Sequence, residues 1–219
     1  MPPGGGEARG QQLATLGKIA HERSTSDEVG KLLDELKKEF AGSDSDESAM
    51  IRVAARNYDK ATRVPAEFVA EQSIVTTAAF EAWVEAKGKS DFSIFLPHLE
   101  KVVGLAQKYV SFFPPADHPY DILLDDYEPG MKTAEVQEIF GSLRPKQVGL
   151  IKQISSAKQV KDDFLHKKYN EKKVWDFSEV IIRRFGYDFN RGRQDKAAHP
   201  FETSFSVDDV RITNRFEPE

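Results

Sequence analysis

The 219-residue chain contains no cysteine, which excludes a disulfide framework and any thiolate metal site or nucleophile. Long apolar runs are missing too: no stretch approaches the roughly 20 residues that a bilayer-spanning helix needs. The start of the chain also lacks the basic and apolar regions of a signal peptide. We therefore expect a soluble, cytoplasmic protein with no membrane partner.

Positive charge is in relatively short supply. Lysine and arginine number 31 against 36 aspartates and glutamates, which gives a formal net charge of -5. Because non-specific nucleic-acid binding depends on neutralising phosphates, this balance argues against a nucleic-acid partner. Hydrophobic residues make up 39% of the chain, enough for one sizeable core or a large piece of a bigger one. We predict a single helical unit over 1–219, with helices in 1–190 and a loop and strand segment in 191–219.

A histidine-based metal motif is absent as well. A helical zinc site commonly uses two histidines one turn apart plus a carboxylate. No two of the five histidines stand three or four residues apart: His21, His98, His118, His166 and His199. We interpret His21, His98, His118 and His166 as ordinary surface or packing residues, and we predict no catalytic residue and no metal bound by this chain alone.

Other catalytic patterns also fail. The run Gly4-Gly5-Gly6 lacks the lysine and the preceding strand of a phosphate-binding loop, and no G-x-S-x-G elbow occurs. Adjacent carboxylates such as Asp125-Asp126 and Asp162-Asp163 point to different faces of a helix or strand. We therefore expect these two pairs to be solvated surface charge.

Helical periodicity dominates what is present. Apolar residues spaced three and four apart indicate a first helix that opens after Gly4-Gly5-Gly6 and ends near Arg23. Its predicted inward face consists of Leu13, Leu16, Ile19 and Ala20. Thr25 followed by Glu28 has capping-box spacing and predicts the start of a second helix.

Prolines and a glycine mark later helices. Pro65 opens one helix, Thr133 is the predicted N-cap of another, and Pro145 is predicted to open the next. The helix after Thr133 has a predicted inward face of Val136, Ile139, Phe140 and Leu143. The last helix is predicted from about Glu171 to Phe185, and Gly186 stands where a left-handed C-terminal cap belongs. The predicted fold class is mainly α and bundle-like, with a small β element near the C-terminus.

The period changes to two near the C-terminus. From position 209 onward, a strand would place Asp209, Arg211, Thr213 and Arg215 on one face and Val210, Ile212 and Asn214 on the other. Two guanidinium groups on one strand face can hold an anion in a fixed orientation. The alternative is a solvated edge strand with paired Arg and Asp side chains, and periodicity alone favours that alternative.

Several short motifs occur together in a fixed order. They are Met1-Pro2-Pro3-Gly4-Gly5 with Ala8-Arg9, Tyr120-Asp121-x-Leu123-Leu124-Asp125-x-Tyr127-Glu128-Pro129-Gly130-Met131, Gly186-Tyr187-Asp188-Phe189, Gly192-Arg193-x-Asp195, His199-Pro200-Phe201 and Asp209-x-Arg211-x-Thr213. With these motifs the chain resembles the carboxypeptidase Taq family of thermostable metallocarboxypeptidases, over its whole length.

The resemblance implies a fold and an activity. It implies half of a cleft-type metallopeptidase, in which a zinc-activated water removes C-terminal residues from peptides. The family's H-E-x-x-H motif follows the arginine-bearing strand, and this chain stops before it. We therefore expect an N-terminal portion that is inactive alone, that needs the missing C-terminal half of the same enzyme, and that leaves apolar surface exposed where that half would pack. The resemblance also allows a homodimer and places zinc, or another divalent metal, in the full-length enzyme.

The resemblance also implies a set of substrate-contacting residues in the 191–219 segment, which would line the cleft and bind the C-terminal carboxylate of a peptide. They are His199, Pro200, Phe201, Asp209, Arg211, Thr213 and Arg215. Arg211 is the strongest candidate, although it could instead brace the metal-bearing helix. A different class of function stays open: a non-catalytic helical protein-interaction module derived from the same fold.

Overall fold

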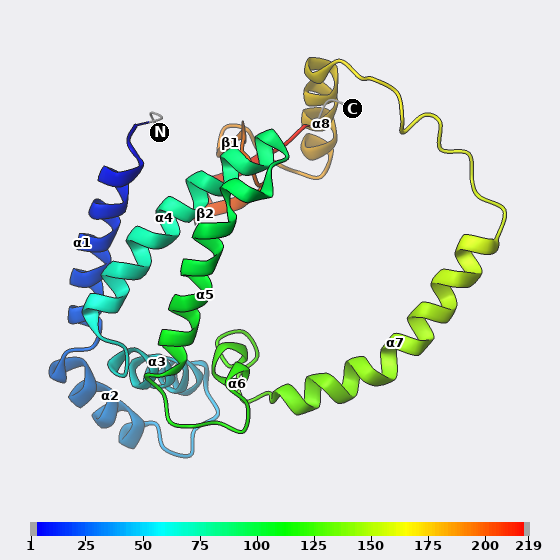
Figure 1. Cartoon of the computed structure of the whole chain (residues 1–219). Coiled ribbons are helices and arrows are strands. Elements are labelled where there is room, and N and C mark those ends of the chain that lie inside the picture. Colours follow the sequence, from blue (N-terminus) through cyan, green and yellow to red (C-terminus); the bar gives the residue numbers. More distant parts are fainter. Residues whose placement is uncertain (1–3, 217–219) are drawn as a thin grey trace. The chain divides into compact units, whose positions relative to one another are not determined.

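The computed structural model describes residues 4–216, which form two compact units that meet in the sequence between Pro145 and Lys146 (Figure 1). The first three residues of the Met1–Gly5 motif therefore lie outside the described part of the chain. The first unit contains α1 (Gly6–Ser24), α2 (Asp27–Glu39), α3 (Asp46–Thr62), α4 (Ala66–Lys89), η1 (Phe92–Ile94), α5 (Leu96–Val110) and α6 (Tyr120–Leu124).

The long helix α7 (Thr133–Ser156) crosses the boundary between the units, and an irregular stretch from 157 to 170 follows it. The second unit then contains α8 (Glu171–Arg184), β1 (Gly192–Lys196), β2 (Glu202–Ser206) and β3 (Asp209–Asn214). The prediction of a mainly α fold with a small β element near the C-terminus is confirmed. Among residues 4–216, no helix is long and apolar enough to cross a bilayer.

Side-chain caps decide where α2 and α3 begin. The Ser26 hydroxyl accepts a hydrogen bond from the Val29 N–H at 3.5 Å, whereas the Thr25 hydroxyl donates to the carbonyl of His21 in the preceding helix. The predicted cap at Thr25 was therefore wrong by one residue. Ser45 caps α3 in the same way, accepting from the Ser48 N–H at 3.3 Å.

Pro145 lies inside α7 and does not open a new helix. Proline removes one backbone donor, and the hydrogen bonds of the flanking turns carry the helix past it. The predicted inward face of this helix is also wrong within the described chain: Ile139, Phe140 and Leu143 are exposed, and α7 has no buried residue. Leu150, Ile151 and Ile154 continue the exposed apolar stripe.

Helices α1 and α4 lie side by side in the first unit (Figure 1). The buried residues of α1 are Gly6, Gly10 and Ala14, four residues apart, so the contact surface is made of small side chains that let two helices approach closely. The buried alanines of α4 are Ala79, Ala82 and Ala86. The predicted inward face of α1 was therefore wrong, since Leu16 and Ile19 are exposed.

The main hydrophobic cluster of the first unit surrounds Phe68, whose side chain is 2% exposed. Val64 and Leu105 are buried beside it. The Phe68 ring meets Phe112 edge-on at a centroid distance of 5.1 Å and stacks with Tyr109 at 6.2 Å. Full burial of such a side chain contributes about 1.5–3 kcal/mol.

The small sheet of the second unit has the strand order β1-β3-β2, with β1 parallel and β2 antiparallel to β3. β3 is therefore the central strand, and its interpretation as an edge strand was wrong. The turn before the sheet uses Gly186, whose φ of 96° confirms the predicted left-handed cap. At Gly192, an added Cβ would lie 1.9 Å from the carbonyl oxygen of Val210, so only glycine permits β1 to pair this closely with β3.

Helix α8 packs against one face of this sheet. The Gln194 amide donates to the Ser178 hydroxyl at 3.1 Å, and the ring of Trp175 meets that of Phe216 edge-on at 5.7 Å. Because side chains alternate along a strand, Arg193 and Asp195 lie on the opposite face of β1 from Gln194. That opposite face carries Asp209 and Arg211, two of the predicted binding residues.

Candidate functional site

Charged side chains of both signs cover the predicted binding face of the sheet. The parallel register places Arg193 of β1 next to Arg211 of β3. Each arginine pairs with an aspartate two residues away on its own strand: Arg193 Nε lies 2.6 Å from Asp195 Oδ2, and Arg211 pairs with Asp209. Each guanidinium group thus has its own counter-charge, which offsets the repulsion between the two neighbouring arginines.

Arg211 is held in one orientation by two parallel hydrogen bonds. Its Nε and Nη2 donate to the two carboxylate oxygens of Asp209 at 2.9 and 3.0 Å, and its guanidinium carbon lies 5.3 Å from the centre of the Phe205 ring. The hydrogen bonds from Arg211 lower the pKa of Asp209, and the same pairing raises the pKa of Arg211. Both groups are therefore charged at neutral pH, and the guanidinium is oriented before any ligand arrives.

Thr213 fastens the His199-Pro200-Phe201 turn to the central strand. Its hydroxyl accepts a hydrogen bond from the Phe201 N–H at 2.7 Å and donates to the Phe201 carbonyl at 3.0 Å. Arg215 adds a second tie, because its Nη1 donates to the carbonyl of Ala198 at 3.0 Å. Arg215 follows the last residue of β3, so it does not extend the strand face as the alternation predicted.

The seven predicted substrate-contacting residues thus lie in one small element, in two arrangements. Asp209 and Arg211 form a charged pair on the sheet face, whereas Thr213 and Arg215 hold the turn that contains His199, Pro200 and Phe201. Phe201 is exposed. Contact with a substrate stays a prediction for all seven.

The described residues do not fit a zinc ion. Within residues 4–216 there is no group of three histidine, aspartate or glutamate side chains that could hold a metal. Where histidine partners are defined they are local or structural: His21 Nε2 lies 2.8 Å from the Val64 carbonyl, and His166 lies 3.2 Å from Asp162. No catalytic step through a metal is therefore derived from these residues.

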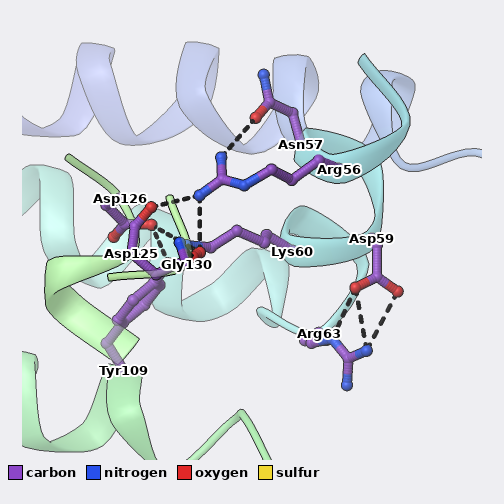
Figure 2. A network of polar contacts seen from close by, with 9 residues as sticks. All are labelled: Arg56, Asn57, Asp59, Lys60, Arg63, Tyr109, Asp125, Asp126 and Gly130. Carbon is purple, nitrogen blue, oxygen red and sulfur yellow. Dashed lines mark hydrogen bonds and ion pairs between the residues drawn. The ribbon is translucent and has the colours of Figure 1, made fainter. Parts of the chain in front are cut away.

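A second polar cluster links α3 to the segment after α6 in the first unit (Figure 2). Asp125 Oδ2 is 2.7 Å from both Arg56 Nη2 and Lys60 Nζ, and Asp125 Oδ1 accepts the Gly130 N–H at 2.9 Å. Lys60 also contacts Asp126. The hydrogen bond from Lys60, with those from Gly130 and Arg56, lowers the pKa of Asp125 to about 2.

Asp125 is therefore not the solvated surface charge that was expected, whereas Asp126 is exposed and pairs with Lys60. The sequence offered no local signal for their partners, which stand 65 to 69 positions earlier in the chain on α3. Tyr109 completes the cluster at 3.5 Å from Asp126 (Figure 2). Burial, and then the charge of Asp126, raise the pKa of Tyr109 to about 12, so this hydroxyl is a neutral donor at ordinary pH.

The start of α7 is fixed by a residue that sequence reasoning missed. Asp121 Oδ1 accepts the backbone N–H of Thr133 at 2.8 Å and the Thr133 hydroxyl at 2.5 Å. These hydrogen bonds, the hydroxyl first, lower the pKa of Asp121. The predicted cap, Thr133, is thus the first residue of α7, and the capping carboxylate comes from α6, twelve positions earlier.

The architecture places the chain among metallocarboxypeptidase folds. It matches the BsuCP crystal structure with a TM-score of 0.92 at 32% identity, and the structure of Trypanosoma cruzi metallocarboxypeptidase 1 with a TM-score of 0.72 at 30% identity. Each match covers 100% of this chain, and 44% and 45% of those chains respectively.

The sequence narrows this class to a family. The model of the carboxypeptidase Taq (M32) metallopeptidases matches residues 1–219, and the chain belongs to that family. Carboxypeptidase 1 of Bacillus subtilis is 32% identical over 217 residues, a match that covers 99% of this chain and 43% of the relative. The chain therefore spans less than half the length of the relatives that it matches, and the family predicted from the short motifs is confirmed.

Proposed function

We propose that this chain is the N-terminal portion of a metallocarboxypeptidase that removes amino acids from the C-terminus of peptides. The observation that carries the proposal is the family match over all 219 residues, together with a TM-score of 0.92 to a related crystal structure. A bound divalent metal, zinc by resemblance, would supply the activation of the attacking water in the complete enzyme. Its ligands come from residues outside this chain, so the chain alone is inactive.

Within that enzyme, Arg211 binds the carboxylate at the end of the peptide. Its Nε and Nη2 are occupied by Asp209, while its Nη1 has no hydrogen bond to any residue between 4 and 216. A fixed guanidinium group with one free edge can donate hydrogen bonds to a carboxylate without a further loss of side-chain rotamer freedom. The geometry of the Asp209–Arg211 pair therefore supports a positioning role for Asp209 and a binding role for Arg211.

The turn at His199, Pro200 and Phe201 forms the neighbouring part of the substrate wall. Thr213 and Arg215 hold its backbone by hydrogen bonds, and the Phe201 side chain is exposed. We propose that this ring contacts the substrate side chains. Thr213 and Arg215 then position the turn.

The test measures metal content and amino-acid release from a short peptide, first on this chain and then on a chain extended to the full length of its relatives. The extended chain should bind metal and release C-terminal residues, and the short chain should do neither. Release by the short chain would contradict the proposal. So would the absence of release from a folded, metal-loaded extended chain.

The role of Arg211 is tested in the extended chain by Arg211→Met, with Arg193→Met as the matched control. The acid form of a peptide should lose about 10- to 100-fold in kcat/KM with Arg211→Met, while a C-terminally amidated peptide should lose little. Arg193→Met should spare both substrates. An equal loss on both substrates, with reduced metal content, would instead support the bracing role of Arg211.

The exposed apolar stripe of α7 favours a second candidate. Ile139, Phe140, Leu143, Leu150 and Ile154 present a helix face that a partner helix could cover, as expected of an interaction module. We propose that the remaining part of the same enzyme covers this face, because the relatives are more than twice as long as this chain. The extended chain should therefore be monodisperse, whereas the short chain should self-associate and bind a hydrophobic dye.

Homodimerisation and a cytoplasmic location stay predictions. Size-exclusion chromatography of the extended chain with light scattering checks the first. Fractionation of the source cells checks the second.

A further inference from the structure

The first unit contains a cavity of about 290 Å³ on the side of α3 that faces α6. Its walls come from α3, the loop after α5, α6 and the segment before α7. The apolar part of the wall includes Phe113, Ile122 and Met131, and the polar part includes Arg63, Asp121 and Lys132. A volume near the lower end of the range for ligand sites suits a molecule of about ten heavy atoms.

One carboxylate oxygen in this cavity lacks a hydrogen-bond donor. Asp121 is 5% exposed, and its Oδ2 has no hydrogen bond from any residue in the described chain. Lys132 Nζ lies 3.6 Å away, close enough for electrostatic attraction but too far for a hydrogen bond. Because buried acceptors are almost always satisfied, we expect a donor from outside residues 4–216 at this oxygen.

The other carboxylates of the cavity are already paired. Asp59 receives hydrogen bonds from Nε and Nη2 of Arg63 at 3.1 to 3.3 Å, and Asp125 is held by Lys60 and Arg56. Figure 2 shows that the Asp59–Arg63 pair is separate from the Asp125 cluster. Asp121 is thus the carboxylate of this cavity that has an ion partner, Lys132, but one oxygen without a hydrogen bond.

The cavity also offers donors for an anion. Arg63 Nη1 makes no hydrogen bond to residues 4–216, and Lys132 Nζ is half-exposed with Asp121 as its one ion partner in that range. Positive and negative groups that each have an ion partner but an unmade hydrogen bond therefore line the same small space, beside an apolar wall. A ligand that satisfies both must carry a donor cation and an anion within a few bonds of each other.

We propose that this cavity binds a free α-amino acid. The ammonium group donates to Asp121 Oδ2, the carboxylate accepts from Arg63 and Lys132, and an apolar side chain packs against Phe113, Ile122 and Met131. The biological meaning rests on the proposed function, since a carboxypeptidase releases amino acids. The binding itself does not depend on that function.

Isothermal titration calorimetry on the 219-residue chain tests the proposal with three probes: leucine, 3-methylbutylamine and 4-methylpentanoate. Leucine carries both charges, and each analogue lacks one. Leucine should bind at least about tenfold more tightly than either analogue, because a missing group leaves a polar partner unpaired. Equal binding of the amine would reduce the cavity to a simple cation site and overturn the proposal, as would the absence of leucine binding.

Three variants locate the binding. Asp121→Asn should weaken leucine binding at least about tenfold, and Ala116→Trp, which fills the cavity from its wall without removing a charge, should abolish it. Lys172→Gln in α8 breaks an exposed ion pair with Asp176 and should leave binding unchanged. If Asp121→Asn unfolds because α7 loses its cap, Ala116→Trp still decides the question, and retained binding in a folded Ala116→Trp chain would overturn the proposal.

Failure here is distinguishable from failure of the proposed function. Leucine binding with no peptide hydrolysis by the extended chain would contradict the proposed carboxypeptidase function and support the amino-acid site. Peptide hydrolysis without leucine binding would support the carboxypeptidase function and contradict the amino-acid site.

Discussion

The two units share the same helical patterning but differ in what they bury. In the first, Phe68, Val64, Leu105 and five other apolar side chains are buried. In the described part of the second, Gln194 alone is buried, and Phe185, the residue that follows α8, is 87% exposed. A periodic stripe therefore predicts that a helix has an apolar face, but not what covers that face. The described part of the second unit is stabilised mainly by hydrogen bonds, exposed ion pairs and two contacts between aromatic rings.

The two tryptophans make this comparison measurable, because Trp83 lies in the first unit and Trp175 in the second. Chains with Trp175→Phe or Trp83→Phe report the unfolding of each unit separately. If the Trp83 and Trp175 signals change at the same urea concentration in the two single-tryptophan chains, the two units unfold together, and their difference in burial does not give them different stabilities.

The largest expected effect is on the first unit's core. Phe68→Ala should lower the free energy of unfolding, reported by Trp83, by about 3–5 kcal/mol, because a 2%-exposed ring leaves a cavity. Phe80→Ala is the matched control on the same helix, since Phe80 is exposed and its removal should have little effect. Similar losses for the two variants would show that Phe68 is not central to the core.

A smaller loss is expected from the charged cluster. Asp125→Asn keeps the acceptor for Gly130 but removes the negative charge between Arg56 and Lys60. We expect a loss of about 1–3 kcal/mol in the Trp83-reported unfolding free energy, less than for a fully buried pair because Asp125 is one-third exposed. Glu85→Gln, which breaks an exposed pair with Lys89, should cause no measurable loss.

The same cluster predicts an acid-dependent stability. Asp125 has a pKa of about 2 in the folded chain against about 3.9 when unfolded, so its contribution is fully present above pH 4 and disappears as the pH falls toward 2. After allowance for solvent screening, about 1–2 kcal/mol should be lost over that window. Urea midpoints at pH 7, 4 and 3 measure the loss, and Asp125→Asn should flatten the slope. An unchanged slope in that variant would assign the acid sensitivity to other carboxylates.

The smallest effect should appear in the second unit alone. Tyr187 donates its hydroxyl hydrogen bond to the carbonyl of Val210 at 2.6 Å, between the turn after α8 and the central strand. Tyr187→Phe should lower the Trp175-reported stability by about 1 kcal/mol and leave the Trp83 signal unchanged. A shift in the Trp83 signal would mean that the sheet supports the first unit.

Local sequence features predicted the fold class well. The last helix, its Gly186 cap and the break at Pro65 depend on residues within a few positions of each other, and their chemistry is the same in any fold. The predicted N-cap of α2 was one residue too early. Thr25 and Ser26 both have hydroxyls, and only the backbone conformation decides which of them caps the helix. Pro145 shows the same limit, since tertiary context decides whether a helix continues past a proline.

The candidate sites depend on residues distant in sequence. Alternation from Asp209 to Asn214 predicted the strand, but its central position requires β1 and β2, whose sequences are too polar to be recognised as strands. The Asp209–Arg211 pair was visible because its members stand two residues apart. The Asp125 cluster and the Asp121–Thr133 cap were not, because nothing in a single sequence shows which distant side chains converge.

Gly192 limits how this segment can vary. The carbonyl of Val210 occupies the place where any side chain would begin, so even a methyl group must push the first strand away from the middle one. That displacement would separate the Arg193 and Arg211 guanidinium groups, whose spacing the strand pairing sets. A library randomised at this single position and screened for a correctly paired sheet should return glycine alone. The absence of a side chain at this position therefore determines how the charged residues are arranged on the whole face.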